Sequence, residues 1–210
     1  GESSASYFTF DPLCPVPTIG GGISAAEPIM YPGAFDQRGR PDFIGCSDTL
    51  PLAARQDVLT FQTEPLALDV EVTGPIEMKL WASSSAVDTD FVAKLVDVFP
   101  ASNEYPDGLA FNISDSIIRA RYRNGYKRPE LMTPGKPYKF VFKLYPTSNI
   151  FRKGHRIRID VSSSNWPRFD VNPNTGGPLG LDRMSGRADQ AVYHTREHPS
   201  HIVLPISQVS

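Results

Sequence analysis

The sequence lacks the features that mark membrane-spanning chains and disulfide-rich secreted domains. No apolar run approaches the length that a transmembrane helix needs, and no signal-peptide core follows the first residues. Cysteine is scarce: Cys14 and Cys46 are the only two in 210 residues, too few for a disulfide framework. We therefore expect no membrane contact and favour a cytoplasmic location, while a single bond between the two cysteines stays open.

Charge of either sign is not in excess. The 21 Lys and Arg residues nearly balance 23 Asp and Glu residues, for a net charge of −2 and an isoelectric point near 6.1. Binding to the phosphate backbone of nucleic acid relies on a surplus of clustered basic side chains. We therefore predict no nucleic-acid partner. Three arginines at alternate positions, Arg119, Arg121 and Arg123, indicate a solvated strand face or a salt-bridged contact with a neighbouring domain.

The sequence has no recognisable set of residues for nucleophilic catalysis. The Gly-x-Ser-x-Gly elbow of α/β-hydrolases is absent. Ser162, Ser163 and Ser164 follow an apolar strand pattern, where hydroxyls are expected to bond to backbone groups at the strand end. His155 shares the parity of the apolar residues in that strand, so we expect a packed histidine with one hydrogen bond. The chain by itself is predicted to hold no catalytic residue and no cofactor.

Candidate metal ligands occur, but their spacing is poor. Three histidines gather near the C-terminus: His194, His198 and His201. Pro199 interrupts this group and prevents the helix on which such spacings would bring imidazoles together. Asp88 and Asp90 resemble a calcium-binding pair, yet carboxylates at a turn before a buried strand more often cap backbone amides. We predict no metal site and leave calcium at these two aspartates as an open alternative.

The chain is rich in short strand patterns. Between residues 156 and 161, isoleucine and valine alternate with arginine and aspartate, the period of a half-buried strand. Pro167 then stops regular pairing, and residues 172–177 consist of turn formers. Similar patterns recur at even spacing, separated by glycine and proline. The expected strands lie near residues 58–63, 70–81, 91–99, 113–123, 138–144, 156–161 and 202–206.

Helical signals are weak, and the best helical candidate is a turn near residues 187–192. Seven or eight short strands joined by tight turns predict an all-β fold, an antiparallel two-sheet sandwich of jelly-roll type, over residues 57–210. Residues 1–56 show no convincing periodicity beyond a short strand candidate at residues 7–10. A loop of this length usually has a role, so we expect an ordered, irregular N-terminal arm packed on a surface of a partner domain.

Several long segments are similar to one family of hydrolases. They are FQTEPLALDVEVTGPIEMKLWASSSAVDTDFVAKLVDVFP, RARYR, GHRIRIDVSSSNWPRFDVNPNTGG and HPSHIVLPI. In this order they resemble the C-terminal domain of the cocaine esterase / X-Pro dipeptidyl-peptidase family of serine hydrolases, over residues 57–206. The segments DPLCPVPTIGG and YPGAFDQR resemble the connection to the catalytic domain, so the resemblance covers nearly the whole chain.

The resemblance implies a galactose-binding-domain-like jelly roll behind an α/β-hydrolase domain that holds a Ser-Asp-His triad. None of that triad can be placed on this sequence. Since the chain begins with Gly1 in place of methionine, we expect a piece of a longer protein.

These expectations lead to a main hypothesis of an accessory domain that is catalytically silent alone. It would pack against the α/β-hydrolase domain of the same protein and wall the substrate pocket, with Met30 and Phe35 as apolar wall residues. Trp166 is expected in the domain interface or, equally, as a cap on the sandwich core. Apolar surface left by an absent partner would also favour a homo-oligomer.

An alternative from another class is a free-standing carbohydrate-binding β-sandwich, which needs exposed aromatic residues on one concave face. The two tryptophans are Trp81 and Trp166, and the strand pattern places Trp81 in the core. An independent enzyme is a third alternative and needs a nucleophile that the sequence does not reveal.

Overall fold

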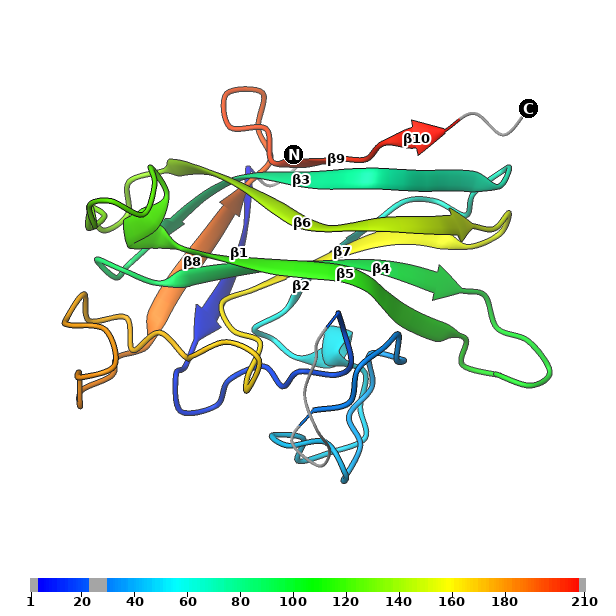
Figure 1. Cartoon of the computed structure of the whole chain (residues 1–210), viewed down its shortest axis with the longest axis horizontal. Helices are drawn as coiled ribbons and strands as arrows, with labels where there is room; N and C mark the ends of the chain where they lie inside the picture. Colours follow the sequence, from blue (N-terminus) through cyan, green and yellow to red (C-terminus); the bar gives the residue numbers. More distant parts are fainter. Residues whose placement is uncertain (1–3, 23–29, 208–210) are drawn as a thin grey trace.

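The computed structural model describes residues 4–22 and 30–207, which form two antiparallel β-sheets packed face to face (Figure 1). The six-stranded sheet consists of β1 (Ala5–Phe10), β3 (Val70–Ser84), β6 (Tyr138–Phe151), β8 (Ala188–Tyr193), β9 (His201–Val203) and β10 (Ile206–Ser207). The four-stranded sheet consists of β2 (Leu59–Gln62), β4 (Asp90–Phe99), β5 (Leu109–Arg119) and β7 (Arg156–Ser162). Two short 3-10 helices, η1 (Leu52–Ala54) and η2 (Ala120–Tyr122), lie in the connections. The predicted all-β sandwich is confirmed.

The chain passes repeatedly from one sheet to the other, except between β4 and β5 and from β8 to β10. In the larger sheet β1 pairs with β8 and β8 with β3, while β6 lies on the other side of β3. In the smaller sheet the order is β2, β7, β4 and β5, and all these pairs are antiparallel. Such alternation is expected when two Greek keys build a jelly roll; the jelly-roll and galactose-binding-domain-like details stay predictions.

The core forms where the inward side chains of the two sheets meet. In β3, the buried residues Ile76, Met78, Leu80 and Ala82 alternate with partly exposed ones, as the period of a strand with one buried face requires. Phe91 of β4 meets Phe140 across the core, with ring centroids 4.9 Å apart. The central strand β4 is buried at every position from residue 90 to 97, because the N-terminal arm covers part of its outer side.

Two local expectations were wrong. Residues 187–192, the best helical candidate, lie almost entirely in β8, because β1 and β3 offer backbone partners on both sides. Trp81 does not lie in the core, because Leu80 and Ala82 occupy the inward positions beside it. Its ring instead packs on the outer side of the six-stranded sheet against His198, with centroids 4.7 Å apart.

The arm lies along the sandwich (Figure 1, blue to cyan), and its first segment is the predicted short strand, now β1. Residues 35–38 run beside β5, where the Gln37 amide donates to the carbonyl of Ala110. A small second apolar cluster holds the arm together: Val16, Ile19, Phe43, Leu52 and Val58. The domain boundary at residue 57 and the packing of the arm on a separate catalytic domain stay predictions. Among the described residues, no helix is long and apolar enough to cross a bilayer.

Candidate functional site

Phe35, a predicted pocket-wall residue, is half-buried in the arm. Its ring lies 5.5 Å from that of Phe43 and 6.4 Å from that of Tyr31, with edge-on or tilted geometry typical of aromatic pairs. The carbonyl of Phe35 accepts a hydrogen bond from Asn112 of β5. Met30, the other predicted wall residue, precedes Tyr31 directly and is also half-buried. The structure therefore brings both predicted wall residues to the same part of the arm.

Trp166, predicted for an interface, joins the arm to the loop that follows β7. Its backbone amide donates to the carbonyl of Val16, and its carbonyl accepts from the amide of Thr18. The indole ring lies over Gly45, where a Cβ atom would approach the ring to 3.1 Å. Trp166 thus fastens two segments of this chain to each other. Its place in an interface with another domain stays a prediction.

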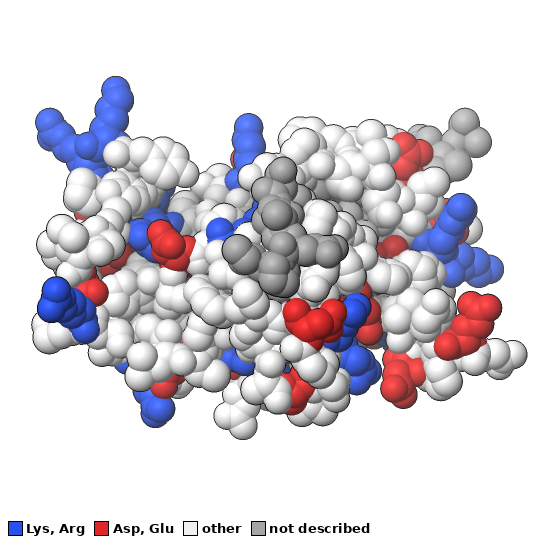
Figure 2. Space-filling view, turned by 60° about the horizontal axis from the view of Figure 1, so that its bottom comes forward, with Lys and Arg blue, Asp and Glu red and all other residues white. Residues whose placement is uncertain are grey.

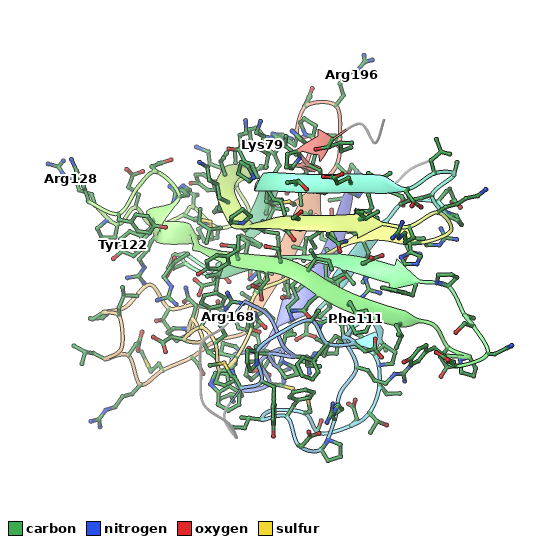
Figure 3. All side chains as sticks on the ribbon, turned by 45° about the vertical axis from the view of Figure 1, so that its right-hand side comes forward. Lys79, Phe111, Tyr122, Arg128, Arg168 and Arg196 are labelled. Atoms are coloured by element: carbon green, nitrogen blue, oxygen red, sulfur yellow. The ribbon has the colours of Figure 1, made fainter. Side chains whose placement is uncertain are left out.

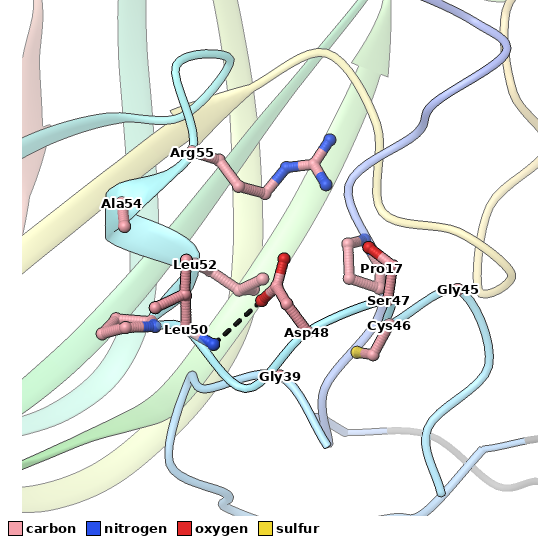
Figure 4. Close-up of a pocket in the computed structure, with 11 residues that line it drawn as sticks. Pro17, Gly39, Gly45, Cys46, Ser47, Asp48, Leu50, Leu52, Ala54 and Arg55 are labelled. Carbon is pink, nitrogen blue, oxygen red and sulfur yellow. Dashed lines mark hydrogen bonds between the residues drawn. The ribbon is translucent and has the colours of Figure 1, made fainter. Parts of the chain in front are cut away.

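A cavity of about 180 Å³ opens in the arm (Figure 4). Asp48 accepts a hydrogen bond from the amide of Leu50 at 2.8 Å, and Cys46 of the same segment also lines the cavity. Arg55 forms two hydrogen bonds to the carboxylate of Asp57, and this pairing raises the pKa of the guanidinium. The two charged side chains of the cavity, Asp48 and Arg55, are thus both engaged in hydrogen bonds.

Neither Met30 nor Phe35 lines the cavity in the arm. Cys14 and Cys46 are both free thiols, which settles the open alternative of a disulfide between them.

A network of buried charges lies between the arm and the four-stranded sheet. Arg168 donates a short hydrogen bond to Asp115 of β5, and Asn165 donates to the other oxygen of that carboxylate at 3.1 Å. Figure 3 shows Arg168 between the arm and this sheet. In the same region, burial lowers the pKa of Lys94 and raises the pKa of Asp160. This network was not predicted, because Arg168 and Asp115 are 53 positions apart and no spacing in the sequence joins them.

Asp88 and Asp90, the calcium alternative, bind arginines. The carboxylate of Asp88 accepts from the backbone amide and Nε of Arg121, at 2.9 and 2.8 Å. The carboxylate of Asp90 accepts two hydrogen bonds of 2.9 Å from Arg119. Asn172 donates to both carboxylates. The expectation of a backbone-capping role is met in part by Asp88. Arg119 and Arg121, expected on a solvated strand face or in a salt-bridged contact with a neighbouring domain, instead form salt bridges within this chain, and Arg121 lies in η2.

His155 is packed, as predicted. Its Nδ1 lies 2.9 Å from a carboxylate oxygen of Asp97, and its ring centroid lies 4.1 Å from that of Phe99. Burial raises the pKa of Asp97 against the opposing effect of this hydrogen bond. A histidine–aspartate pair invites a search for a nucleophile, but Ser162 lies at the far end of β7, about 23 Å away at the usual rise of a strand.

The serine run has structural partners. The hydroxyl of Ser162 donates to the carbonyl of Ser164, whose own hydroxyl accepts from the amide of Val16. Ser163 is hydrogen-bonded to Gln190. These contacts confirm the prediction that the serines satisfy groups at the strand end.

A serine–histidine contact was not predicted. The hydroxyl of Ser6 in β1 lies 3.3 Å from Nε2 of His194, which directly follows β8. In the described structure no hydrogen bond joins the other ring nitrogen of His194 to a carboxylate, so the group lacks the acid that orients a catalytic imidazole. No pattern in the sequence reveals this contact, because the two residues are 188 positions apart.

The C-terminal histidines do not converge on a metal ion. His198 packs between the rings of Trp81 and Tyr193, and Nδ1 of His201 bonds to the carbonyl of Pro199. Within residues 4–22 and 30–207, no group of three His, Cys, Asp or Glu side chains is placed to hold a metal. The described chain therefore shows neither a metal centre nor a complete catalytic triad, and its polar clusters stabilise the fold.

Comparison with known proteins assigns the chain to a family. Residues 10–203 match the family described as the X-Pro dipeptidyl-peptidase C-terminal non-catalytic domain. The cocaine esterase of Rhodococcus sp. (strain MB1 Bresler) is 43% identical over 208 residues, which cover 98% of this chain and 33% of the esterase.

Two solved structures share the fold along almost the whole chain. An α-amino acid ester hydrolase superposes with a TM-score of 0.81 and 32% identity, over 99% of this chain and 33% of the hydrolase. An aminopeptidase from a marine sediment Thaumarchaeota archaeon gives the same TM-score, with 30% identity over 99% of this chain and 34% of the aminopeptidase. The chain thus spans about a third of the length of these relatives. By its sequence and its sandwich, this chain belongs to the family of X-Pro dipeptidyl-peptidase C-terminal non-catalytic domains.

Proposed function

We propose that the chain is the C-terminal accessory domain of a serine hydrolase of the acyl-esterase or X-Pro dipeptidyl-peptidase type. The observation that carries this proposal is the match of nearly the whole chain to only 33% of an esterase and of an ester hydrolase. The described residues contain no complete nucleophile, base and acid group, which suits a supporting role. The proposed partner is an α/β-hydrolase catalytic domain in the same protein.

The arm is the proposed contact surface for that domain. The face that carries it bears both signs of charge, with uncharged atoms over much of the rest (Figure 2). Exposed apolar side chains of the arm are Leu13, Ile44 and Leu50. Uncharged and apolar surface of this kind favours contact with another protein surface over water.

The finer proposal is that Met30 and Phe35 contribute to the wall of the substrate pocket. Both are half-buried here, so part of each side chain remains accessible to an added domain. Apolar wall residues change the affinity for a substrate without taking part in bond breaking.

The first test is hydrolysis of a p-nitrophenyl ester by the purified 210-residue chain, with a serine-directed fluorophosphonate as a probe. An accessory domain should show no turnover above the uncatalysed reaction and no labelled serine. Stoichiometric labelling of one serine, for example Ser6 beside His194, would show that the chain is itself an enzyme and would overturn the proposal.

A second test addresses the pocket wall in the full-length hydrolase. Met30→Ala should change KM or the preference among acyl groups while leaving kcat within about threefold, since uniform binding is lost but not transition-state chemistry. Met184→Ala is the matched control, because Met184 is 73% exposed on a loop of the sandwich. If Met30→Ala and Met184→Ala change KM and the acyl preference equally, Met30 is not part of the pocket wall.

A further inference from the structure

A second cavity lies between the two sheets, on the side where β2 and β7 face β3, β8 and β9. Its volume is about 220 Å³. The six-stranded sheet contributes Met78, Leu80 and Val192, and the four-stranded sheet contributes Phe61, Ile159 and Val161. Two of the strands on this side are short, with four residues in β2 and three in β9. Few side chains are therefore available to fill the space between the sheets.

The wall of this sheet cavity is almost entirely apolar, and its size is that of a small ring. An apolar cavity of about 150 Å³ lined by Leu, Ile and Phe stays dry and binds benzene. The sheet cavity is larger and has the same kind of lining, so water gains few hydrogen bonds inside it. An apolar ligand would restore the dispersion contacts that the facing wall atoms lack.

Three side chains favour an aromatic ring over an alkyl group of equal size. The thioether of Met78 makes favourable contacts with ring edges. Phe61, 36% exposed at the opening, offers a second ring, and the His194 ring lies 6.4 Å from it in an edge-on arrangement. Aromatic side chains in such positions prefer offset or edge-on contact with another ring.

The polar groups near the opening are engaged elsewhere. Nδ1 of His201 lies 2.7 Å from the carbonyl oxygen of Pro199. The register pairs His201 with the outward-facing Lys79 and Ile202 with the inward-facing Met78, so it is Ile202 that points between the sheets. The hydroxyl of Ser200 is bonded to the amide and carbonyl of Trp81. The cavity therefore selects for an aromatic ring and not for a polar substituent.

We propose that the sheet cavity is a binding site for a small monocyclic aromatic molecule, for which phenol is a soluble probe. The ring lies between the sheets against Met78 and Phe61. This site belongs to the sandwich itself and does not depend on the proposed catalytic domain.

The test is a titration of the 210-residue chain with phenol, followed by NMR of ¹³C-methyl-labelled methionine. Of the four methionines in the chain, only Met78 lines the sheet cavity. Its methyl signal, assigned with Met78→Leu, should shift by the ring current and saturate with a Kd on the order of 0.1–1 mM, in the range of ligand efficiencies for small ligands. Cyclohexanol, which has similar size and a hydroxyl but no aromatic ring, should bind several-fold more weakly.

A pair of substitutions on one strand localises the binding. Ile202→Trp places an indole in the opening and should weaken phenol binding by about tenfold or more, because the space is filled. Val203→Trp is the control, because Val203 follows directly in β9, is 43% exposed and does not line the sheet cavity. Should Ile202→Trp fail to fold, Phe61→Leu is the second variant. It should weaken binding of phenol and leave that of cyclohexanol unchanged.

Three results would overturn the proposal. The first is the absence of a saturable shift at Met78 up to the solubility of phenol. The second is equal affinity for cyclohexanol and phenol, which would show a general apolar void. The third is an equal loss of binding in Val203→Trp and Ile202→Trp, which would place the phenol elsewhere.

Discussion

The buried ammonium of Lys94 donates a hydrogen bond to Oε1 of Gln37 across 3.2 Å, and this contact joins the central strand β4 to the arm. Both side chains are almost fully enclosed, with 3% and 1% exposed. The amide of Gln37 in turn donates to the carbonyls of Ile19 and Phe35. One lysine on the sheet thereby fixes two separate segments of the arm, and the arm is part of the folded unit.

The burial of Lys94 predicts a pH dependence of stability. Burial lowers the pKa of Lys94 below its usual value of 10.5, although Asp115 and Asp160 oppose this. Between the lowered pKa and 10.5 the unfolded chain binds the proton that the folded chain has released. The free energy of unfolding therefore rises with pH through this window. In Lys94→Met this contribution disappears.

Urea unfolding at several pH values from neutral to about the usual lysine pKa measures this effect. The unfolding free energy of the original chain minus that of Lys94→Met should increase as the pH rises. Lys139→Met, at an exposed position of β6, is the control and should show no such trend. If the unfolding free energies of the original chain and of Lys94→Met change with pH in parallel, Lys94 keeps its usual pKa.

The ion pair of Arg168 with Asp115 should be a strong determinant of stability. Their side chains are 6% and 2% exposed. Arg168→Ala leaves the carboxylate of Asp115 buried without its cation, which costs about 3–5 kcal/mol of unfolding free energy. Urea denaturation followed by tryptophan fluorescence measures the loss.

The control for Arg168 is Arg183→Ala, at an exposed position in the loop before β8. It should change the unfolding free energy by no more than about 0.5 kcal/mol. Similar small effects of both substitutions would mean that water replaces the guanidinium beside Asp115.

Calcium should not stabilise the chain, because the oxygens of Asp88 are bonded to Arg121 and Asn172. Thermal unfolding with millimolar calcium and with a chelator should give the same Tm. Asp88→Ala should lower the unfolding free energy by about 3–5 kcal/mol, since it leaves a buried guanidinium unpaired. A rise in Tm with calcium that Asp88→Ala abolishes would restore the calcium alternative.

A glycine in the arm should be intolerant of a side chain for two separable reasons. Gly20 has a φ of +62°, and a Cβ there would collide with the carbonyl oxygen of Gly33. Gly154 has a φ of +85° with open space around its Cβ position, so Gly154→Ala reports the backbone cost alone, about 1–2 kcal/mol. Gly20→Ala should cost about 1–3 kcal/mol more, because the steric clash is added. If Gly20→Ala and Gly154→Ala lower the unfolding free energy in urea by the same amount, the arm can move away from the added Cβ atom at no cost.

The strands were predictable because their signal is local. The alternation of Ile157, Ile159 and Val161 with charged residues and the mainly apolar sequence of β4 follow directly from which faces are buried. The pattern failed where long-range pairing overrides it. Residues 188–193 form a strand only because β1 and β3 flank them, and Trp81 faces outward only because its neighbours in β3 fill the core.

The candidate sites were less predictable than the strands. His155 and the serine run behaved as expected: the ring of His155 makes a hydrogen bond to Asp97, and the hydroxyl of Ser162 donates to the carbonyl of Ser164, two residues away. The contact of Ser6 with His194 and the cavity between the sheets join residues far apart along the chain. No spacing in the sequence encodes either of them.

The sequence by itself determined the β-sandwich and the membership in a hydrolase-associated family, because strand periodicity and long ordered motifs are properties of consecutive residues. Tertiary structure alone decided which charges are buried. Nothing in the local sequence names the partners of Lys94 and Arg168: the arm supplies the Gln37 amide to Lys94, and β5 supplies the Asp115 carboxylate to Arg168, and these partners make burial tolerable. The same holds for the space between the sheets, since its volume depends on how two distant sets of strands approach each other.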